Sequence, residues 1–584
     1  MGKFLLGLFT GAVLVVLVVV LGVFAVASLK SKPPSVEDGS TLVLRLSGDV
    51  PEKPSVEVPI PLLADKAALT VENIWSVLRR AAKDSRIRAV VFEPDGAGVG
   101  WAKMQEIRSD IEAFRKSGKP VYAYLKTPST RDYYMASACT KIYMLPSDVL
   151  NVKGIALELM YFKGTLDKLG VQVDVEHAGK YKDYGDMFTK TSMSAETKEV
   201  LDTVADEIYA DLISVIAKGR GKDVAAVRKL LDDGPFLAGQ AKANGLVDEL
   251  RYEDEMFGEL KTALKQTELK KIAEHDYLSS PDASVVTQDK VAWVVGEGSI
   301  TRGDADSSGD SGIESAAFVK MLSKVANDAS VKGVVVRIDS PGGEVMASDE
   351  LWRAMNELRK KKAVVISMSD AAASGGYYMA MTGDTIVAYP GTETGSIGVV
   401  FAKPNLRGLY DKVGISKSLI SRGKFATIES EYEPMTEAGR LKLREGIDSE
   451  YQDFLAKVAA ARKKKVAEIE PVAQGRVWLG DQAKANGLVD ELGGIDRALE
   501  LVKKKAGIPA TSNVNLVLYP GRRSVLDVLF RQSGESSEAE ARAVDAMLSR
   551  TGLEAFRAAW HDDRTRVFLR GGMLRMMPFT MEFR

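Results

Sequence analysis

The chain has 584 residues, enough for roughly two to four domains with sizeable cores. Its 79 basic and 80 acidic side chains nearly balance, so net charge gives no support to a nucleic-acid partner. The single cysteine, Cys139, excludes an intrachain disulfide and a cysteine-rich metal site, and we expect it in the core. The three histidines, His177, His275 and His561, offer little material for a metal cluster or a Ser-His-Asp triad.

The N-terminus carries a long apolar segment. Phe4 to Leu29 contains no charged residue, and about 20 apolar residues suffice to cross a bilayer as a helix. The segment is longer than the apolar part of an ordinary signal peptide, and no clear A-x-A cleavage site follows it. We therefore expect residues 1–30 to form one uncleaved transmembrane anchor, with residues 4–29 in contact with lipid, and residues 31–41 to form a polar linker. The lysines on either side leave the membrane orientation open.

Beyond the linker the chain repeats itself. Gln240 to Leu250 reads QAKANGLVDEL, and Gln482 to Leu492 repeats these letters unchanged. Other blocks, such as the Tyr-Tyr-Met-Ala sequences at 133–136 and 377–380, recur about 244 residues apart. The sequence therefore predicts a tandem duplication, with these boundaries: an N-terminal half at 42–252, a connecting segment at 253–289, a C-terminal half at 290–508, and a tail of no assigned role at 509–584.

Each half alternates helical patterns with short β-branched runs. In the first half a helical pattern at 71–82 precedes a strand pattern at 89–92, and in the second half 317–327 precedes 333–338. Alternation of this kind predicts α/β domains with a largely parallel sheet.

A serine at a strand-to-helix corner of the second half is the candidate nucleophile. The apolar run at 363–368 predicts a buried strand, and Ser374-Gly375-Gly376 then leads into a helical pattern. A serine at such a corner can expose its hydroxyl beside free backbone N–H groups. The first half has Thr130 at this position and lacks the glycine pair, so it would be a poor acyl-transfer site.

The candidate base comes from the first half. When the Gly-Lys-aromatic triplets of the two halves are aligned, Lys182 falls opposite Ala426. Each half lacks what the other has, so the sequence predicts one composite site. To act as a base near neutral pH, a lysine must lose about three pKa units from its usual 10.4, which burial can supply. We expect the carboxylates of Asp183 and Asp186 to point away from the amine.

A glycine turn completes the candidate site. Residues 337–345 read RIDSPGGEV, in which Pro341 fixes φ and Gly342-Gly343 let the backbone pass close to a ligand. An N–H group of this turn and the N–H of Gly375 are the predicted oxyanion hole. A helix that begins at Ser374 would add the positive end of its dipole.

Together these motifs resemble the long, tandem-domain form of bacterial signal peptide peptidase, the protease IV type, which has the Clp-protease/crotonase fold. The likeness covers roughly residues 42–507 and the N-terminal anchor. The motifs that carry it are SPGG at 340–343, ASGGYY at 373–378, TGSIG at 394–398 and GKYK at 179–182. Jointly they are specific, whereas SPGG alone is typical of the wider superfamily.

The resemblance implies a Ser/Lys dyad, in which Ser374 is the nucleophile, Lys182 is the general base and Ser396 orients the lysine. No cofactor and no metal are implied. The family likeness also implies a homo-tetramer on the bacterial cytoplasmic membrane, anchored by a single pass, with the catalytic part outside the cytoplasm. The substrates would be signal peptides left in the membrane after preprotein cleavage, and other hydrophobic peptides.

Two other functions stay open at the level of the sequence. A crotonase-type enzyme that acts on a coenzyme A thioester would share the fold and the oxyanion turn, but it needs neither the serine–lysine pair nor an anchor. A membrane-anchored scaffold would bind peptides without cutting them, and its Ser374 would not react with a serine-directed probe.

Overall fold

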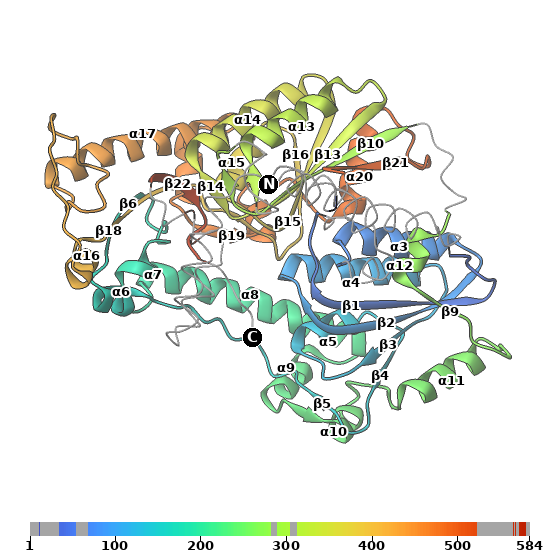
Figure 1. Cartoon of the computed structure of the whole chain (residues 1–584). Coiled ribbons are helices and arrows are strands. Elements are labelled where there is room, and N and C mark those ends of the chain that lie inside the picture. Colours follow the sequence, from blue (N-terminus) through green and yellow to red (C-terminus); the bar gives the residue numbers. More distant parts are fainter. Residues whose placement is uncertain are drawn as a thin grey trace.

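The computed structural model describes residues 11, 34–53, 68–281, 289–303, 312–521, 565, 567 and 572–579. It contains two α/β halves side by side, the N-terminal one blue to teal and the C-terminal one green to orange (Figure 1). The predicted anchor at Phe4 to Leu29 lies outside the described residues, apart from residue 11. No helix in the described ranges is long and apolar enough to cross a membrane.

The N-terminal half is built on a six-stranded parallel sheet. In β2 (Ile87–Gly98), residues 89–92 are all fully buried, which explains their continuous apolar run, because a parallel strand is covered on both faces. Thr70 caps the helix that precedes this strand by accepting a hydrogen bond from the backbone N–H of Asn73. The sheet order is β8 (Glu249–Leu250), β4 (Lys141–Met144), β3 (Val121–Leu125), β2, β1 (Ser40–Asp49) and β9 (Lys271–Ala273).

The C-terminal half repeats this sheet strand for strand. Its order is β20 (Glu491–Leu492), β16 (Thr385–Ala388), β15 (Ala363–Ala373), β13 (Val331–Ser340), β10 (Lys290–Glu297) and β21 (Asn515–Tyr519). All of these neighbours are parallel. At its far end β15 also pairs with β17 (Glu393–Gly395), which lies antiparallel to β19 (Val477–Leu479). The predicted duplication is therefore confirmed at the level of topology.

The helices recur in the same order. The pairs are α3 (Val71–Lys83) and α13 (Ser315–Asn327), α4 (Trp101–Arg115) and α14 (Val345–Arg359), α5 (Thr130–Ala136) and α15 (Gly375–Met379), α6 (Lys163–Leu169) and α16 (Arg407–Val413), and α8 (Ala195–Arg220) and α17 (Glu437–Arg462). Glycines in the left-handed conformation end both α6 and α16, at Gly170 and Gly414. The repeat thus extends to the helix caps.

A third sheet joins the two halves. Its order is β12 (Ile313–Glu314), β11 (Ile300–Thr301), β14 (Gly342–Glu344), β22 (Gly572–Met576), β18 (Val399–Asn405) and β6 (Gln172–Ala178). Strand β6 of the N-terminal half lies antiparallel to β18 of the C-terminal half along its whole length. This pairing brings the GKYK motif of the first half to the SPGG turn of the second.

Three predicted segments differ from the structure at their boundaries. The sheet of the N-terminal half begins at Ser40 inside the predicted linker, and it takes β9 from the predicted connecting segment at 253–289. The tail, for which the sequence indicates no role, supplies β21 to the C-terminal sheet and β22 to the third sheet. These strands are three to five residues long, too short to show a hydrophobic period.

Candidate active site

Ser374 lies between β15 and α15, at the end of a central strand. Its backbone has φ 53° and ψ −110°, a strained conformation for a residue with a side chain. Its N–H donates to the carbonyl oxygen of Gly395 at 2.8 Å, and its own carbonyl oxygen accepts from the N–H of Tyr378 at 2.7 Å. The neighbouring strand and the following helix therefore hold the serine in this sharp corner.

Lys182 follows β6 and reaches across the interface to this corner. Its Nζ lies 2.8 Å from Ser374 Oγ, 2.8 Å from Ser396 Oγ and 2.9 Å from the Ser396 carbonyl oxygen. All three residues are fully buried. A neutral amine can donate its two N–H groups to the two Ser396 oxygens, which leaves the nitrogen lone pair for the hydroxyl of Ser374. The three residues singled out in the sequence meet within one chain.

The surroundings of Lys182 favour its neutral form. Burial lowers the pKa of Lys182 well below the usual 10.5, Asp183 raises it in part, and Arg575 lowers it further. The Asp183 carboxylate accepts hydrogen bonds from Thr197 and Ser194, and burial raises the pKa of this carboxyl to about 6. Asp186 forms an ion pair with Lys190 at 2.7 Å. Both carboxylates are thus engaged by residues outside the serine–lysine contact, as expected.

Two glycines make room for the lysine stem: Gly475, for which the sequence predicts no role, and Gly398, the last residue of the TGSIG motif. A Cβ added at Gly475 would lie 2.7 Å from both the backbone nitrogen and the Cβ of Lys182, and one at Gly398 would lie 3.1 Å from its Cδ. Gly475 also has φ 76°, which favours glycine. Gly475 could have been found by comparing the two halves. When the QAKANGLVDEL repeats are aligned, Gly475 of the second half falls opposite Asp233 of the first, so the glycine is particular to the second half.

The predicted oxyanion glycines lie together beside Ser374. Gly342 has φ 101°, and a Cβ on it would lie 2.7 Å from the amide nitrogen of Gly375. A Cβ on Gly343 would lie 2.0 Å from the carbonyl oxygen of Ile300. The Ser340 hydroxyl, fully buried, accepts from the Gly342 N–H at 3.2 Å and donates to the Gly298 carbonyl oxygen at 2.7 Å. Only glycine fits this turn.

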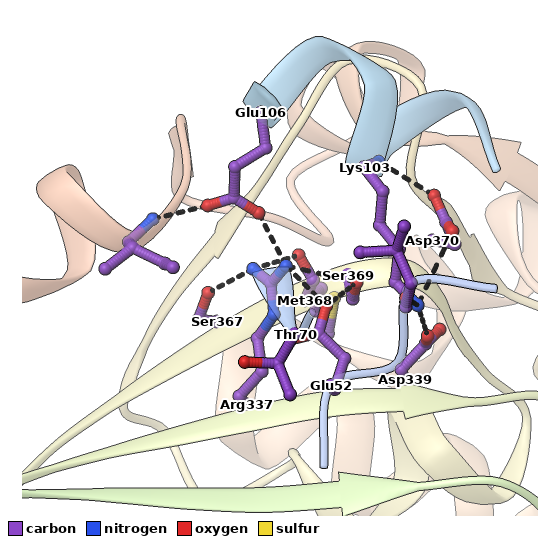
Figure 2. A network of polar contacts seen from close by, with 12 residues as sticks. Glu52, Thr70, Lys103, Glu106, Arg337, Asp339, Ser367, Met368, Ser369 and Asp370 are labelled. Atoms are coloured by element: carbon purple, nitrogen blue, oxygen red, sulfur yellow. Dashed lines mark hydrogen bonds and ion pairs between the residues drawn. The ribbon is translucent and has the colours of Figure 1, made fainter. Parts of the chain in front are cut away.

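A lysine of the N-terminal half connects the two loops of the site, as Figure 2 shows. Lys103 Nζ, on α4, lies 2.8 Å from Asp339 Oδ2 and 3.9 Å from Asp370 Oδ2. Asp339 directly precedes the SPGG turn, and its Oδ1 accepts from the N–H of Ala371 at 3.0 Å. Burial lowers the pKa of Lys103, but nearby carboxylates, with Asp339 and Asp370 first among them, together raise it above its usual value, so the lysine stays charged. This ion pair ties the glycine turn and the serine strand to the other half.

A buried arginine makes a second contact of this kind. Arg337 Nη2 lies 2.8 Å from Glu52 Oε1 and 2.5 Å from Glu106 Oε2, with all three side chains almost completely buried (Figure 2). Glu106 also accepts from the backbone N–H of Ile495 at 2.7 Å. Because both carboxylates come from the N-terminal half and Arg337 from the C-terminal half, the network fixes the relative position of the halves.

We predict that Lys103→Met destabilises the protein by about 3–5 kcal/mol, because it leaves two largely buried carboxylates without their cation. Urea unfolding at neutral pH measures this free energy. The matched control is Lys116→Met, which removes an exposed lysine just beyond the same helix and is expected to change the unfolding free energy by less than about 0.5 kcal/mol. Equal unfolding midpoints for the two variants would contradict the structural role of Lys103.

We predict that Ser396→Ala lowers kcat by about 10-fold with little change in KM, since the amine of Lys182 keeps the Ser396 carbonyl oxygen but loses the hydroxyl. Steady-state hydrolysis of a fluorogenic peptide separates the two constants. Ser117→Ala, at an exposed serine, serves as the control. A wild-type kcat in Ser396→Ala would show that the hydroxyl does not position the lysine.

The cysteine and the two histidines that the structure describes lie apart from the serine–lysine pair. Among them, no group of three or more His, Cys, Asp or Glu side chains is placed to hold a metal ion. Cys139 is buried in the core, and burial raises the pKa of its thiol to about 12. His177 is exposed and contacts the Gly179 carbonyl oxygen, while His275 contacts Glu274. Neither of these histidines contacts Ser374.

Comparison with known proteins places the chain in a family. Residues 113–268 and 356–509 each match the family model described as "Peptidase family S49". Protease 4 of Salmonella typhi is 30% identical over 534 residues, which cover 87% of this chain and 84% of that protein. Protease 4 of Haemophilus influenzae is 31% identical over 443 residues, 73% of this chain and 71% of that protein. The chloroplastic serine protease SPPA of Arabidopsis thaliana is 35% identical over 491 residues, which cover 82% of this chain and 71% of that protein. The chain belongs to peptidase family S49 and is a serine protease with two tandem copies of the family domain.

Proposed function

We propose that the protein is a membrane-anchored endopeptidase that uses Ser374 as nucleophile and Lys182 as general base. The observation that carries this proposal is the 2.8 Å contact between Lys182 Nζ and Ser374 Oγ, both fully buried, in surroundings that lower the pKa of the lysine. A buried, neutral lysine can take the proton of a serine hydroxyl, which a solvated ammonium cannot.

The proposed cycle follows from the positions of these groups. Lys182 removes the proton of Ser374, and the resulting alkoxide attacks a peptide carbonyl carbon. The N–H groups of Gly375 and Gly343 stabilise the oxyanion, since the N–H of Gly342 is bonded to the Ser340 hydroxyl. Lys182 then protonates the leaving amine, and a water molecule, deprotonated by Lys182, hydrolyses the acyl-enzyme. The resemblance to the Clp-protease/crotonase fold supports this use of a glycine turn.

The proposed substrates are signal peptides released by preprotein cleavage and other hydrophobic peptides. Support comes from the apolar segment at 4–29, which would place the protein on the cytoplasmic membrane where such peptides remain. The catalytic part would then stand outside the cytoplasm. The third sheet supports binding of extended peptides, since β14 and β18 already hold one extended segment, β22, between them.

The internal repeat supports self-association of the chain. Within one chain, a Cβ added at Gly170 would lie 2.6 Å from the carbonyl carbon of Gly408, so the two glycines allow α6 and α16 to pack closely. Their repeat counterparts are Gly414 and Gly164, in that order. Among the described atoms, nothing lies within 4 Å of a Cβ at either counterpart. In an assembly, Gly414 of one chain could pack against Gly164 of the next, just as Gly170 packs against Gly408 within one chain.

The strands beside these glycines support the same arrangement. The counterparts of β6 and β18 are residues 416–422 and 155–161, and residues 416–422 are exposed, with Ile420 87% exposed. In the register of β6 and β18, Ile420 of one chain would face Leu157 of the next. Such a contact joins two different surfaces and can close into a ring, in keeping with the predicted homo-tetramer.

The assembly is tested by Ile420→Asp, which is expected to reduce the mass of the particle in sedimentation velocity. The control is Val224→Asp, at an apolar residue 52% exposed on α9 (Val224–Asp232). An unchanged sedimentation coefficient in Ile420→Asp would refute the proposed contact.

The function is tested with an alkyl fluorophosphonate and a signal-peptide substrate in detergent micelles. We expect the probe to label Ser374, as mapped by mass spectrometry, and the peptide to be cleaved. Binding of the peptide without labelling or cleavage would favour a scaffold. Turnover of an acyl-CoA thioester without peptide cleavage would favour a crotonase-type enzyme.

A further inference from the structure

The C-terminal strand β22 lies beside the candidate active site as a bound peptide would. It is antiparallel to β14 on one edge and to β18 on the other, with Arg575 opposite Gly343. The N–H of Met577 donates to the carbonyl oxygen of Pro341 at 2.8 Å. An extended segment that pairs with strands on both sides is the arrangement by which sheets bind peptides.

One carbonyl group of this strand contacts the proposed oxyanion glycines. A Cβ added at Gly342 would lie 2.0 Å from the carbonyl oxygen of Arg575, and a Cβ added at Gly375 would lie 3.1 Å from the same oxygen. Both glycines therefore touch this carbonyl. A peptide held in the same register would present the carbonyl of its corresponding residue to Ser374, which directly precedes Gly375.

The side chain of Arg575 fills a pocket of matching chemistry. It is fully buried, and its guanidinium carbon lies 3.6 Å from the centre of the Tyr378 ring and 5.4 Å from that of Phe454. Its Nη2 forms an ion pair with Glu450 Oε2 at 2.9 Å, and its Nη1 donates to the carbonyl oxygen of Val345 at 3.3 Å. Helices α14, α15 and α17 of the C-terminal half supply these groups.

The charges around the pocket favour a basic side chain. Beside Glu450 lie Asp453, 3.7 Å from Arg575 Nη2, and Asp349. Lys457 pairs with both aspartates, at 2.7 and 2.8 Å. Apart from Arg575, the three carboxylates of Glu450, Asp453 and Asp349 have one lysine near them. Without Arg575 the pocket would therefore hold an excess of negative charge. A neutral or acidic side chain in place of Arg575 would leave Glu450 without its partner.

We propose that this pocket receives the side chain that precedes the cleaved bond and selects arginine or lysine there, and that β22 occupies the groove as a substrate mimic. The inference rests on the proposed serine–lysine mechanism and names its substrate class. In the tail, Arg575 is followed by Met576, Met577 and then Phe579. A basic residue followed by an apolar run is also what a signal peptide presents where its charged n-region meets its apolar h-region.

The reaction expected on a free peptide of this sequence is an ordinary hydrolysis. Ser374 Oγ forms an ester with the arginine carbonyl carbon while the bond to the following methionine nitrogen breaks. That nitrogen leaves as an amine with the proton that Lys182 carries. Water then hydrolyses the ester to a free arginine carboxylate and regenerates the serine.

The test uses the full chain and a synthetic octapeptide with the sequence of residues 572–579, GMLRMMPF. We expect mass spectrometry to show cleavage between Arg and Met, and kcat/KM about 10- to 100-fold higher than for the same peptide with Leu in place of Arg. In Glu450→Gln this ratio is expected to fall at least about 5-fold. In the control Glu445→Gln, at an exposed glutamate of the same helix, the ratio is expected to stay as in the wild type.

An unchanged ratio in Glu450→Gln, or cleavage at another bond of the octapeptide, would overturn the pocket assignment. The proposed function would survive that result if the probe still labels Ser374 and the leucine peptide is still cut. Arg575→Glu provides a second variant, because a glutamate facing Glu450 should expel β22 and open the groove. We expect faster labelling of Ser374 in that variant, and an equal or slower labelling rate would refute the occupation of the groove by the tail.

Discussion

Replacing Lys182 with methionine is expected to lower kcat/KM for peptide hydrolysis by about 10²- to 10⁴-fold, the usual contribution of a general base. Methionine fills much of the same volume but cannot accept the proton of Ser374. Initial rates with a fluorogenic hydrophobic peptide measure the loss. Lys180→Met is the matched control, because Lys180 lies two residues away, is exposed and contacts the Tyr181 ring rather than the serine. Similar rates in the two variants would contradict the assignment of the base.

The same substitution is expected to raise the thermal stability. Burial lowers the pKa of Lys182, so between that pKa and 10.5 the unfolded chain binds a proton that the folded chain does not. The free energy of unfolding therefore rises with pH across this window in the wild type, and at neutral pH the buried amine destabilises the fold. Lys182→Met removes this contribution, and thermal unfolding at pH 7 should give a higher Tm than the wild type. A lower Tm would show that the lysine stabilises the fold through its three hydrogen bonds.

Replacing Ser374 with alanine is expected to abolish hydrolysis, with a loss of roughly 10⁶-fold in kcat, and to abolish labelling by the fluorophosphonate. The Oγ atom of Ser374 makes the attack on the peptide carbonyl, and no neighbouring group can replace this nucleophile. Because alanine keeps the Cβ, the fold and the sedimentation coefficient should not change. Residual hydrolysis above about one-hundredth of the wild-type rate would identify a different nucleophile.

The control for this variant is Ser369→Ala, five residues earlier, in the strand β15 that leads to Ser374. Ser369 is buried and hydrogen-bonded to Arg337 and Glu52, so its loss perturbs the interface between the halves without removing the nucleophile. We expect Ser369→Ala to lower the Tm but to keep the probe reactive. Loss of labelling in both variants would indicate that the site is lost through misfolding rather than chemistry.

The composite nature of the site could be predicted from the sequence because the duplication supplies its own comparison. Gly179, Lys180 and the aromatic residue after them persist in both halves, while Lys182 and Ser374 each occur in one half alone. The structure places these two side chains in contact because β6 and β18 pair across the halves. That pairing joins segments far apart in the sequence, and the hydrophobic pattern of a strand does not identify the strand with which it pairs.

The parts that could not be predicted are of two kinds. Short strands such as Lys271–Ala273 and Gly572–Met576 carry too few residues to show a hydrophobic period, and their place depends on which strands of the folded halves they pair with. Charges such as Lys103 and Arg575 resemble solvated surface residues in the sequence. Their burial follows from partners more than 200 and 100 residues away, respectively, at Asp339 and Glu450. Tertiary contacts, rather than local pattern, decide their roles.

The most direct test of the serine–lysine pair is the rate at which Ser374 is labelled by the fluorophosphonate as a function of pH. Labelling requires the neutral form of Lys182, so in the wild type the rate should rise with pH through a single ionisation that lies well below 10.5 and then level off. In Lys182→Met the rate should be slow and should lack this ionisation. An identical pH profile and rate in the two proteins would contradict the account.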